Sequence, residues 1–189
     1  NATDFGDLLA NRERGGGSSS STRAVYQGGY PTPSGANNPD NTIQYVTMRS
    51  TGNATDFGDL TYSPREAGTG SNDVRAITYS GWVNGNVNTA TIDYITIPTT
   101  GNATDFGDSA TPRSAITNNI NSPTIDYVTI PTAGNSTDFG DLAGAAYTLA
   151  GLSSNTRGVM AGPTSGESAS NTIQYITIAS TGNASDFGD

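Results

Sequence analysis

Paired aspartates are the most frequent reactive pattern in this chain. Five copies of an Asp-Phe-Gly-Asp sequence begin at Asp4, Asp56, Asp105, Asp138 and Asp186, and they contain ten of the seventeen acidic residues. Carboxylates are ligands for Ca²⁺, but this ion takes six to eight oxygens and one pair supplies few of them. Aspartate also accepts backbone N–H groups in turns. Because the pair recurs with the repeat, we favour turn capping and expect no bound metal and no cofactor.

The residues around these aspartates suggest a second chemistry. An Asn-x-Thr/Ser triplet precedes each pair, at Asn1, Asn53, Asn102, Asn135 and Asn183. In a eukaryotic secreted protein each triplet would be a site for N-glycosylation. The full sequence, Thr51 to Asp59 in its complete form and here called the motif, also contains the turn-forming pair Gly-Asn. We therefore favour a turn and leave glycosylation open.

Three arginines occupy equivalent positions, at Arg23, Arg75 and Arg157, fifteen residues after Leu8, Leu60 and Leu142. Gathered at one point they could bind a carboxylate. Equivalent positions in a repeat lie apart, however, so we expect structural arginines that pair with the aspartates or with carbonyl groups at strand ends.

The best candidates for ligand binding lie in loops of variable length and sequence, at 30–40, 82–88 and 163–168. Rigid scaffolds carry function on such loops. Aromatic rings beside amides could stack on a sugar and hydrogen-bond to it, although a lone Trp can equally cover a neighbouring sheet. The predicted ligand-binding residues are Tyr30, Asn37, Asn38, Trp82, Asn84 and Asn86.

Composition excludes several classes of protein. The 189 residues include no Cys, His or Lys, which removes zinc and blue-copper sites, disulfides and His-dependent serine triads. The net charge of −9 lies in the motif aspartates, and the rest of the chain sums to about +1. Without clustered basic residues we expect no nucleic-acid partner, and without a long apolar run no membrane insertion. We expect a protein that is not an enzyme.

The motif copies divide the chain into repeats. Their periods are 52, 49, 33 and 48 residues, which gives repeats at 8–59, 60–108, 109–141 (shortened) and 142–189, with 1–7 as an extra copy of the fourth strand. Each repeat contains an Ile-x-Tyr strand, eleven residues before the first motif Asp, at Tyr45, Tyr94, Tyr127 and Tyr175. Such runs of β-branched and aromatic residues predict strands.

The Ile-x-Tyr strands are apolar on both faces. In the second repeat, alternation places Ile92 and Tyr94 on one face and Ile95 and Ile97 on the other. A strand covered on both faces lies within a stack of sheets. The motif itself predicts a short edge strand with one buried Phe. The sequence therefore predicts an all-β fold with about four strands per repeat, a pattern typical of β-propeller blades.

The order of these elements resembles the kelch repeat. The matching stations are Ser63-Pro64-Arg65, Ala24 to Gly29, Ile43 to Tyr45, and Phe57. The sequence of the motif is similar to that of the repeats in kelch-like proteins encoded by aquatic phages, including cyanophages. Kelch repeats usually have Trp where this chain has Phe, and the double Gly occurs only at Gly28-Gly29. In the third repeat, Arg113 aligns either with Arg65 or with Arg75.

This resemblance implies that residues 1–189 form a single β-propeller or a propeller segment, located in a virion or outside cells. Two classes of function follow. One is a structural or binding protein of a phage tail, fibre or neck appendage, contacting host surface polysaccharide or other structural subunits through its loops. The other is a self-assembling extracellular filament or homo-oligomer, because the chain begins and ends on the same strand of the repeat and exposed strand edges pair readily.

Overall fold

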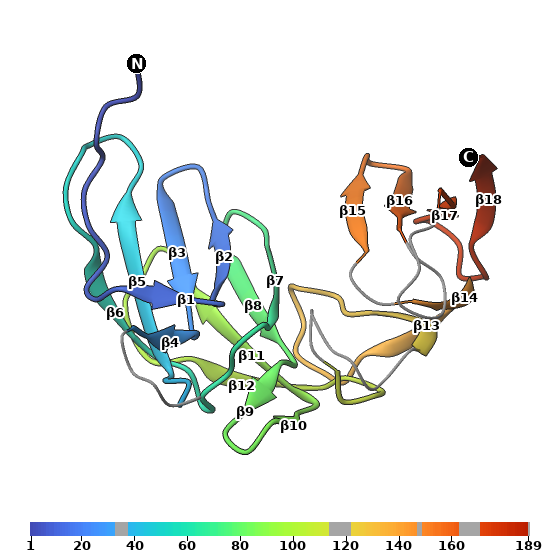
Figure 1. Cartoon of the computed structure of the whole chain (residues 1–189), viewed down its shortest axis with the longest axis horizontal. Coiled ribbons are helices and arrows are strands. Elements are labelled where there is room, and N and C mark those ends of the chain that lie inside the picture. Colours follow the sequence, from blue (N-terminus) through green and yellow to red (C-terminus); the bar gives the residue numbers. More distant parts are fainter. Residues whose placement is uncertain (33–37, 114–121, 147–148, 163–170, 189) are drawn as a thin grey trace. The chain divides into compact units, whose positions relative to one another are not determined.

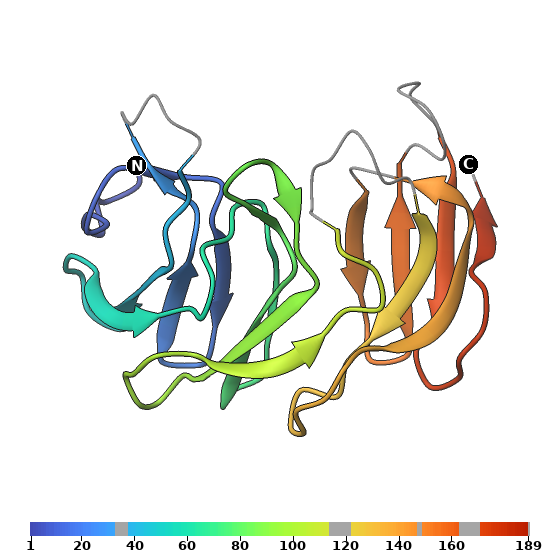
Figure 2. The same cartoon turned by 90° about the horizontal axis from the view of Figure 1, so that it is seen from below.

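The computed structural model describes residues 1–32, 38–113, 122–146, 149–162 and 171–188. Within this part of the chain the elements are all strands, joined by turns and loops, and no helix is long and apolar enough to cross a membrane. The chain divides into two compact units. The first contains 1–114 and 129–135, and the second contains 115–128 and 136–189 (Figures 1 and 2).

Three repeats each form one four-stranded antiparallel sheet, and the strands lie in the sheet in sequence order. The first sheet comprises β2 (Gly16–Ser19), β3 (Arg23–Gln27), β5 (Thr42–Thr47) and β6 (Thr55–Asp59). The second comprises β7 (Gly68–Ser71), β8 (Arg75–Tyr79), β11 (Thr91–Thr96) and β12 (Thr104–Asp108). The sheet of the fourth repeat comprises β15 (Ala150–Ser153), β16 (Arg157–Ala161), β17 (Ile173–Thr177) and β18 (Ser185–Gly188). The predicted all-β fold is confirmed, with four strands in each of these repeats.

The third repeat contributes a two-stranded sheet of β13 (Ser122–Tyr127) and β14 (Thr137–Ala146), and 114–121 lie outside the described residues. The carbonyl of Arg113 accepts the N–H of Gly81, as the carbonyl of Pro64 accepts that of Gly29. This contact places Arg113 at the position of Pro64, one residue before that of Arg65. Two short hairpin pairs, β1 (Arg12–Glu13) with β4 (Tyr30–Pro31) and β9 (Trp82–Val83) with β10 (Val87–Asn88), lie at the variable loops.

The N-terminal copy of the motif differs from the prediction, because residues 1–7 form no strand. Each other copy pairs with the Ile-x-Tyr strand of its own repeat, whereas this copy pairs in that way with none of the described strands. It is held instead on one side only. The carbonyls of Phe5 and Asp7 accept the N–H groups of Gly52 and Ala54, at 2.7 and 2.8 Å.

The motif forms a β-bulge in each of the four sheets. In the first sheet Ile43 pairs with Gly58 and Gln44 pairs with Asp56, so Phe57 is the extra residue, and the other three copies shift register at the same place. A bulge bends its strand and redirects the extra residue. Gly58 has φ of +143°, a conformation that favours glycine over any residue with a Cβ.

Each copy of the motif bonds to the next copy. The carbonyl of Phe57 accepts the N–H of Gly101 at 2.7 Å, and the carbonyl of Asp59 accepts that of Ala103 at 2.8 Å. In return, the N–H of Asp59 donates to Oδ1 of Asn102 at 3.1 Å. The Gly bond and the Asn bond recur at all four junctions between successive copies. The motif is therefore the connector between repeats.

In the first unit, the core lies between the first two sheets. Val25, Ile43 and Phe57 of the first repeat form one buried cluster with Ala76, Ile95 and Ile97 of the second. Strands β2 and β7 lie side by side, because Oγ1 of Thr69 and Oγ of Ser71 donate to carbonyls of Gly17 and Ser19 at 2.7 and 2.8 Å. On its other face β11 packs Tyr94 edge-on against Phe106. The prediction that this strand is covered on both faces is confirmed.

Candidate functional site

The variable loops of the first two repeats meet at Arg65. Its backbone pairs with that of Trp82 through bonds of 2.8 and 2.9 Å. Its guanidinium lies 4.8 Å from the ring centroid of Trp82 and 5.9 Å from that of Tyr30. Tyr30 and Trp82, which were predicted as binding residues in different loops, thus both lie beside the buried guanidinium of Arg65.

A second cation and its counter-ion lie beside Tyr30. Arg14 donates to Glu66 at 2.6 Å, and the Glu66 side chain is only 4% exposed. The hydrogen bond to Glu66 raises the pKa of Arg14. A further ion pair joins Arg12 to Asp40 at the base of the first loop. Buried charges of this kind need such partners, so these pairs fix the bases of both loops.

The structure separates the predicted binding residues into packed and exposed ones. Tyr30 is buried, with the guanidinium groups of Arg14 and Arg65 within 6 Å of its ring centroid. Its ring contributes to packing and offers no open stacking surface. Trp82 is half-buried and stacks on Arg65.

The exposed candidates are amides. Asn84 accepts the N–H of Gly85 at the tip of the β9–β10 hairpin, and Asn86 accepts a hydrogen bond from Arg65. Asn38 is exposed near the end of the first loop, whereas Asn37 and the loop at 163–168 lie outside the described residues.

The β9–β10 hairpin has two unsatisfied polar atoms. The indole N–H of Trp82 and Oδ1 of Asn88 are buried, and neither has a hydrogen-bond partner among the described residues. The strand register places these two residues opposite each other. Buried polar groups without a partner cost free energy, so this donor and acceptor are suited to a polar group supplied from outside.

Sequence reasoning missed Arg14, Arg65 and Glu66. Their signal was visible, because charged residues are scarce outside the motif and two groups of them, 12–14 and 65–66, lie one repeat apart. A buried ion pair between repeats would have accounted for this spacing.

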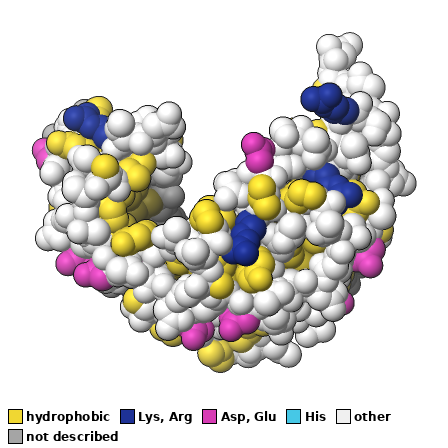
Figure 3. Space-filling model, turned by 180° about the vertical axis from the view of Figure 1, so that it is seen from behind, with side chains coloured by type: hydrophobic (Ala, Val, Ile, Leu, Met, Phe, Trp, Pro, Cys, Tyr) yellow, Lys and Arg dark blue, Asp and Glu magenta, His cyan; other side chains and the backbone are white. Residues whose placement is uncertain are grey.

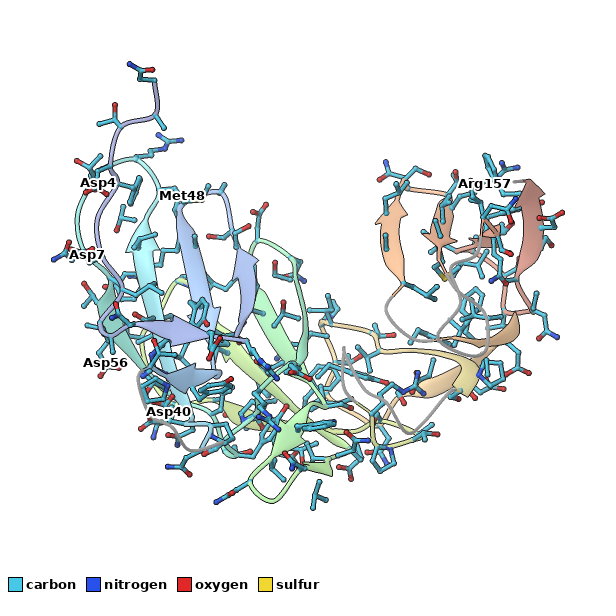
Figure 4. All side chains as sticks on the ribbon, viewed as in Figure 1. Asp4, Asp7, Asp40, Met48, Asp56 and Arg157 are labelled. Atoms are coloured by element: carbon cyan, nitrogen blue, oxygen red, sulfur yellow. The ribbon has the colours of Figure 1, made fainter. Side chains whose placement is uncertain are left out.

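Three of the motif aspartates act as turn caps. Oδ1 of Asp4, Asp105 and Asp186 accepts the N–H of the glycine two residues later, at 3.1 to 3.2 Å. Asp4, Asp7 and Asp56 lie along one edge of the first unit (Figure 4). Acidic side chains form small separate groups on the face shown in Figure 3. No group of three potential metal-ligating His, Cys, Asp or Glu residues occurs among the residues described.

The equivalent arginines are structural, as predicted. Arg23, Arg75 and Arg157 each lie over the Tyr of their own Ile-x-Tyr strand, 4.4 to 4.6 Å from its ring centroid. Arg23 also donates to the carbonyl of Ile97 at 2.8 Å, and Arg75 to that of Pro131 at 2.8 Å. These bonds reach from one repeat to the next, to carbonyls at or just beyond strand ends.

In the first, second and fourth repeats, a buried polar residue between Ile and Tyr of the same strand holds the start of the repeat. Gln44 and Gln174 accept the N–H of Leu9 and Ala143, at 2.8 and 2.7 Å. Asp93 accepts both the N–H and the hydroxyl of Thr61 at 2.7 Å. Burial raises the pKa of Asp93, and the two bonds from Thr61 oppose this rise.

No protein-family model matches this chain, and no curated protein matches its sequence. The fold and contacts define it as an all-β repeat protein whose repeats are joined by the motif.

Proposed function

We propose that this chain is a non-enzymatic structural and binding protein, built as a kelch-like β-propeller or propeller segment in which each four-stranded sheet is one blade. The order of the strands in each sheet supports this architecture, as does the side-by-side position of β2 and β7 at the start of neighbouring sheets. The resemblance of the motif to those of phage-encoded proteins supports a place in a virion, in a tail, fibre or neck appendage.

The proposed binding surface is the end of the first unit that carries the loops at 30–40 and 82–88. The observation that carries this proposal is the pair of unsatisfied buried atoms, the indole N–H of Trp82 and Oδ1 of Asn88. Because both atoms are buried, a hydroxyl group has to enter the hairpin to accept from the first and donate to the second, and we propose that a hydroxyl of a host surface glycan does so. The partner is then a glycan, or a virion protein that presents hydroxyl or amide groups.

The ion pairs beneath the loops contribute to binding through rigidity. Arg65 holds the hairpin that bears Trp82, and Asn84 and Asn86 stand exposed on the same hairpin. A surface that is ordered before binding loses less conformational entropy on contact with its partner. Exposed amides donate and accept at once, which suits the paired donors and acceptors of sugars.

A glycan array tests this proposal with three variants. Trp82→Phe keeps an aromatic ring over Arg65 but removes the N–H, and Asn88→Ala removes the opposing acceptor. Ser50→Ala is the control, because Ser50 is exposed in the turn that follows β5, at the other end of that strand. We expect binding by the wild type and the control, with a loss of about tenfold or more in the two hairpin variants. Binding that is equal in all four proteins would refute the role of the hairpin, and a wild type that binds no glycan would refute the glycan partner.

A second function is favoured by a different observation. Phe57, Phe106 and Phe139 are buried, whereas Phe187 in the last copy of the motif is 54% exposed. We propose as the alternative a self-assembling extracellular filament protein, in which exposed ends of the repeat array join chain to chain.

A further inference from the structure

One face of the first sheet is exposed, whereas the equivalent face of the second sheet is buried. Met48 and Leu8 are 48% and 42% exposed, whereas the equivalent residues of the second repeat, Ile97 and Leu60, are 0% and 3% exposed. Those two residues belong to the core between the first and second sheets. The N-terminal face, defined as Leu8, Ala24, Tyr26, Val46 and Met48, therefore has the side chains of a buried face, and no described sheet of the first unit covers it.

This face is also hollowed. A cavity of about 210 Å³ opens on it, and its lining is almost wholly apolar, including Leu8, Ala24, Tyr26 and Val46. In the second repeat, Ala76 and Ile95 stand at the positions of Ala24 and Val46, and both are buried in the core shared with the first sheet. The cavity thus marks a place that a sheet of the same kind fills elsewhere in the chain.

The fourth repeat carries the complementary side chains. In the first sheet, the face that covers the second sheet consists of Arg23, Val25, Tyr45 and Phe57. The strand registers place Arg157, Val159, Tyr175 and Phe187 at the same stations of β16, β17 and β18. Phe187 again meets Tyr175 edge-on, with 5.9 Å between centroids, as Phe57 meets Tyr45. We call these four residues of the fourth repeat the C-terminal face.

We propose that the N-terminal face of one copy of this chain binds the C-terminal face of a second copy, and that the contact repeats the junction between the first and second sheets. Phe187 and Val159 cover the apolar cavity. Arg157 donates to the carbonyl of Met48, because Arg23 donates to the carbonyl of the equivalent residue, Ile97. Met48 and Arg157 are labelled in Figure 4, each in its own unit.

The chemistry of the junction makes the partner specific. The arginine contact requires a carbonyl group at the end of an Ile-x-Tyr strand, and the cavity requires an aromatic or aliphatic face beside it. The two faces are different surfaces, so the contact is head-to-tail and continues into an open chain or a closed ring of molecules. This inference rests on the assembly alternative and is independent of glycan binding by the loops.

Two variants that each disable one face test the inference. Met48→Glu places a charge on the N-terminal face, and Phe187→Ser removes the main apolar group of the C-terminal face. Both residues are exposed, so each variant is expected to fold, which circular dichroism and the urea midpoint verify. Val87→Glu is the control, because Val87 is similarly exposed, at 57%, on the β9–β10 hairpin.

Sedimentation velocity over a range of protein concentrations gives the result. We expect the wild type and Val87→Glu to associate as concentration rises, and each face variant alone to associate at least about tenfold more weakly. A mixture of Met48→Glu with Phe187→Ser should form 1:1 dimers and nothing larger, because each variant keeps one intact face.

Two outcomes would overturn the inference, and they are distinguishable. If the wild type associates but Met48→Glu and Phe187→Ser associate equally well, assembly stands and the proposed faces are wrong. If the wild type remains a single 19.3 kDa species at every concentration, both the assembly function and the proposed contact fail.

Discussion

Gly58 provides the sharpest test of how the motif joins repeats. A Cβ at this position would lie 2.5 Å from the carbonyl carbon of Gly101, far inside van der Waals contact. Gly58→Ala should therefore push the two copies of the motif apart. The backbone bonds from Gly101 to Phe57 and from Ala103 to Asp59, at 2.7 and 2.8 Å, would be lost or lengthened.

Gly101→Ala is the matched control. Gly101 has φ of +155°, close to the +143° of Gly58, but a Cβ there meets nothing within 4 Å. Both substitutions carry a similar backbone strain, of about 1–3 kcal/mol. Only Gly58→Ala also loses the two backbone bonds, each contributing about 1 kcal/mol. We expect Gly58→Ala to be the less stable of the two by about 2 kcal/mol.

Urea unfolding followed by tryptophan fluorescence measures this difference. Trp82 is the only Trp and lies in the first unit with Gly58 and Gly101, so its emission reports the unit concerned. The exposed bond from Asp59 to Asn102 is left out of the sum, because water replaces it readily. Equal free energies of unfolding for the two variants would refute the idea that close approach at Gly58 joins the repeats.

Three further substitutions probe other contacts, again by urea unfolding. Asn102→Ala removes the exposed acceptor for the N–H of Asp59 and should lower the free energy of unfolding by about 0.5 kcal/mol, whereas Asn102→Asp keeps an acceptor and should lose less; equal losses would contradict this. Arg23→Ala loses its contact with Tyr45 and its bond to Ile97, which should cost about 1–2 kcal/mol, while Arg49→Ala at an exposed site should cost little. The raised pKa of Asp93 means that the folded state holds more protons than the unfolded state between the two pKa values, so the free energy of unfolding falls as pH rises through that window. Asp93→Asn removes this contribution, and its stability relative to wild type should therefore increase from acidic to neutral pH; a constant difference would contradict the assignment.

The strands were predictable because their signals are local. The Ile-x-Tyr strand follows from its run of β-branched and aromatic residues, and it appears in all four repeats where the sequence placed it. The alternation of β11 also predicted correctly that Ile95 and Ile97 share one face. Residues 1–7 were predicted as an extra copy of the fourth strand and are not assigned as a strand, although the same sequence at 53–59 contains β6, which pairs with β5.

The contacts between repeats were not predictable from the sequence. Phe57 forms a bulge only because its strand pairs with β5, and its carbonyl accepts the N–H of Gly101, more than forty residues later in the chain. The candidate site shows the same limit. Tyr30 has the composition of a sugar-stacking residue, yet Arg14 and Arg65, from segments remote in sequence, occupy the space around its ring.

The Phe residues show most directly that burial here is a property of the junction and not of the motif. Phe57 and Phe187 lie in nearly identical sequences, form the same bulge and meet a Tyr in the same edge-on geometry. One is 3% exposed and the other 54%, because Phe57 belongs to the core that the first sheet shares with the second, and the described part of the chain places no such sheet on Phe187. Burial of Phe187 by a similar sheet would therefore contribute favourable free energy, as the burial of Phe57 does. Met48 differs from Ile97 in the same way. A further sheet of the same kind would therefore bury apolar side chains on both the N-terminal face and the C-terminal face.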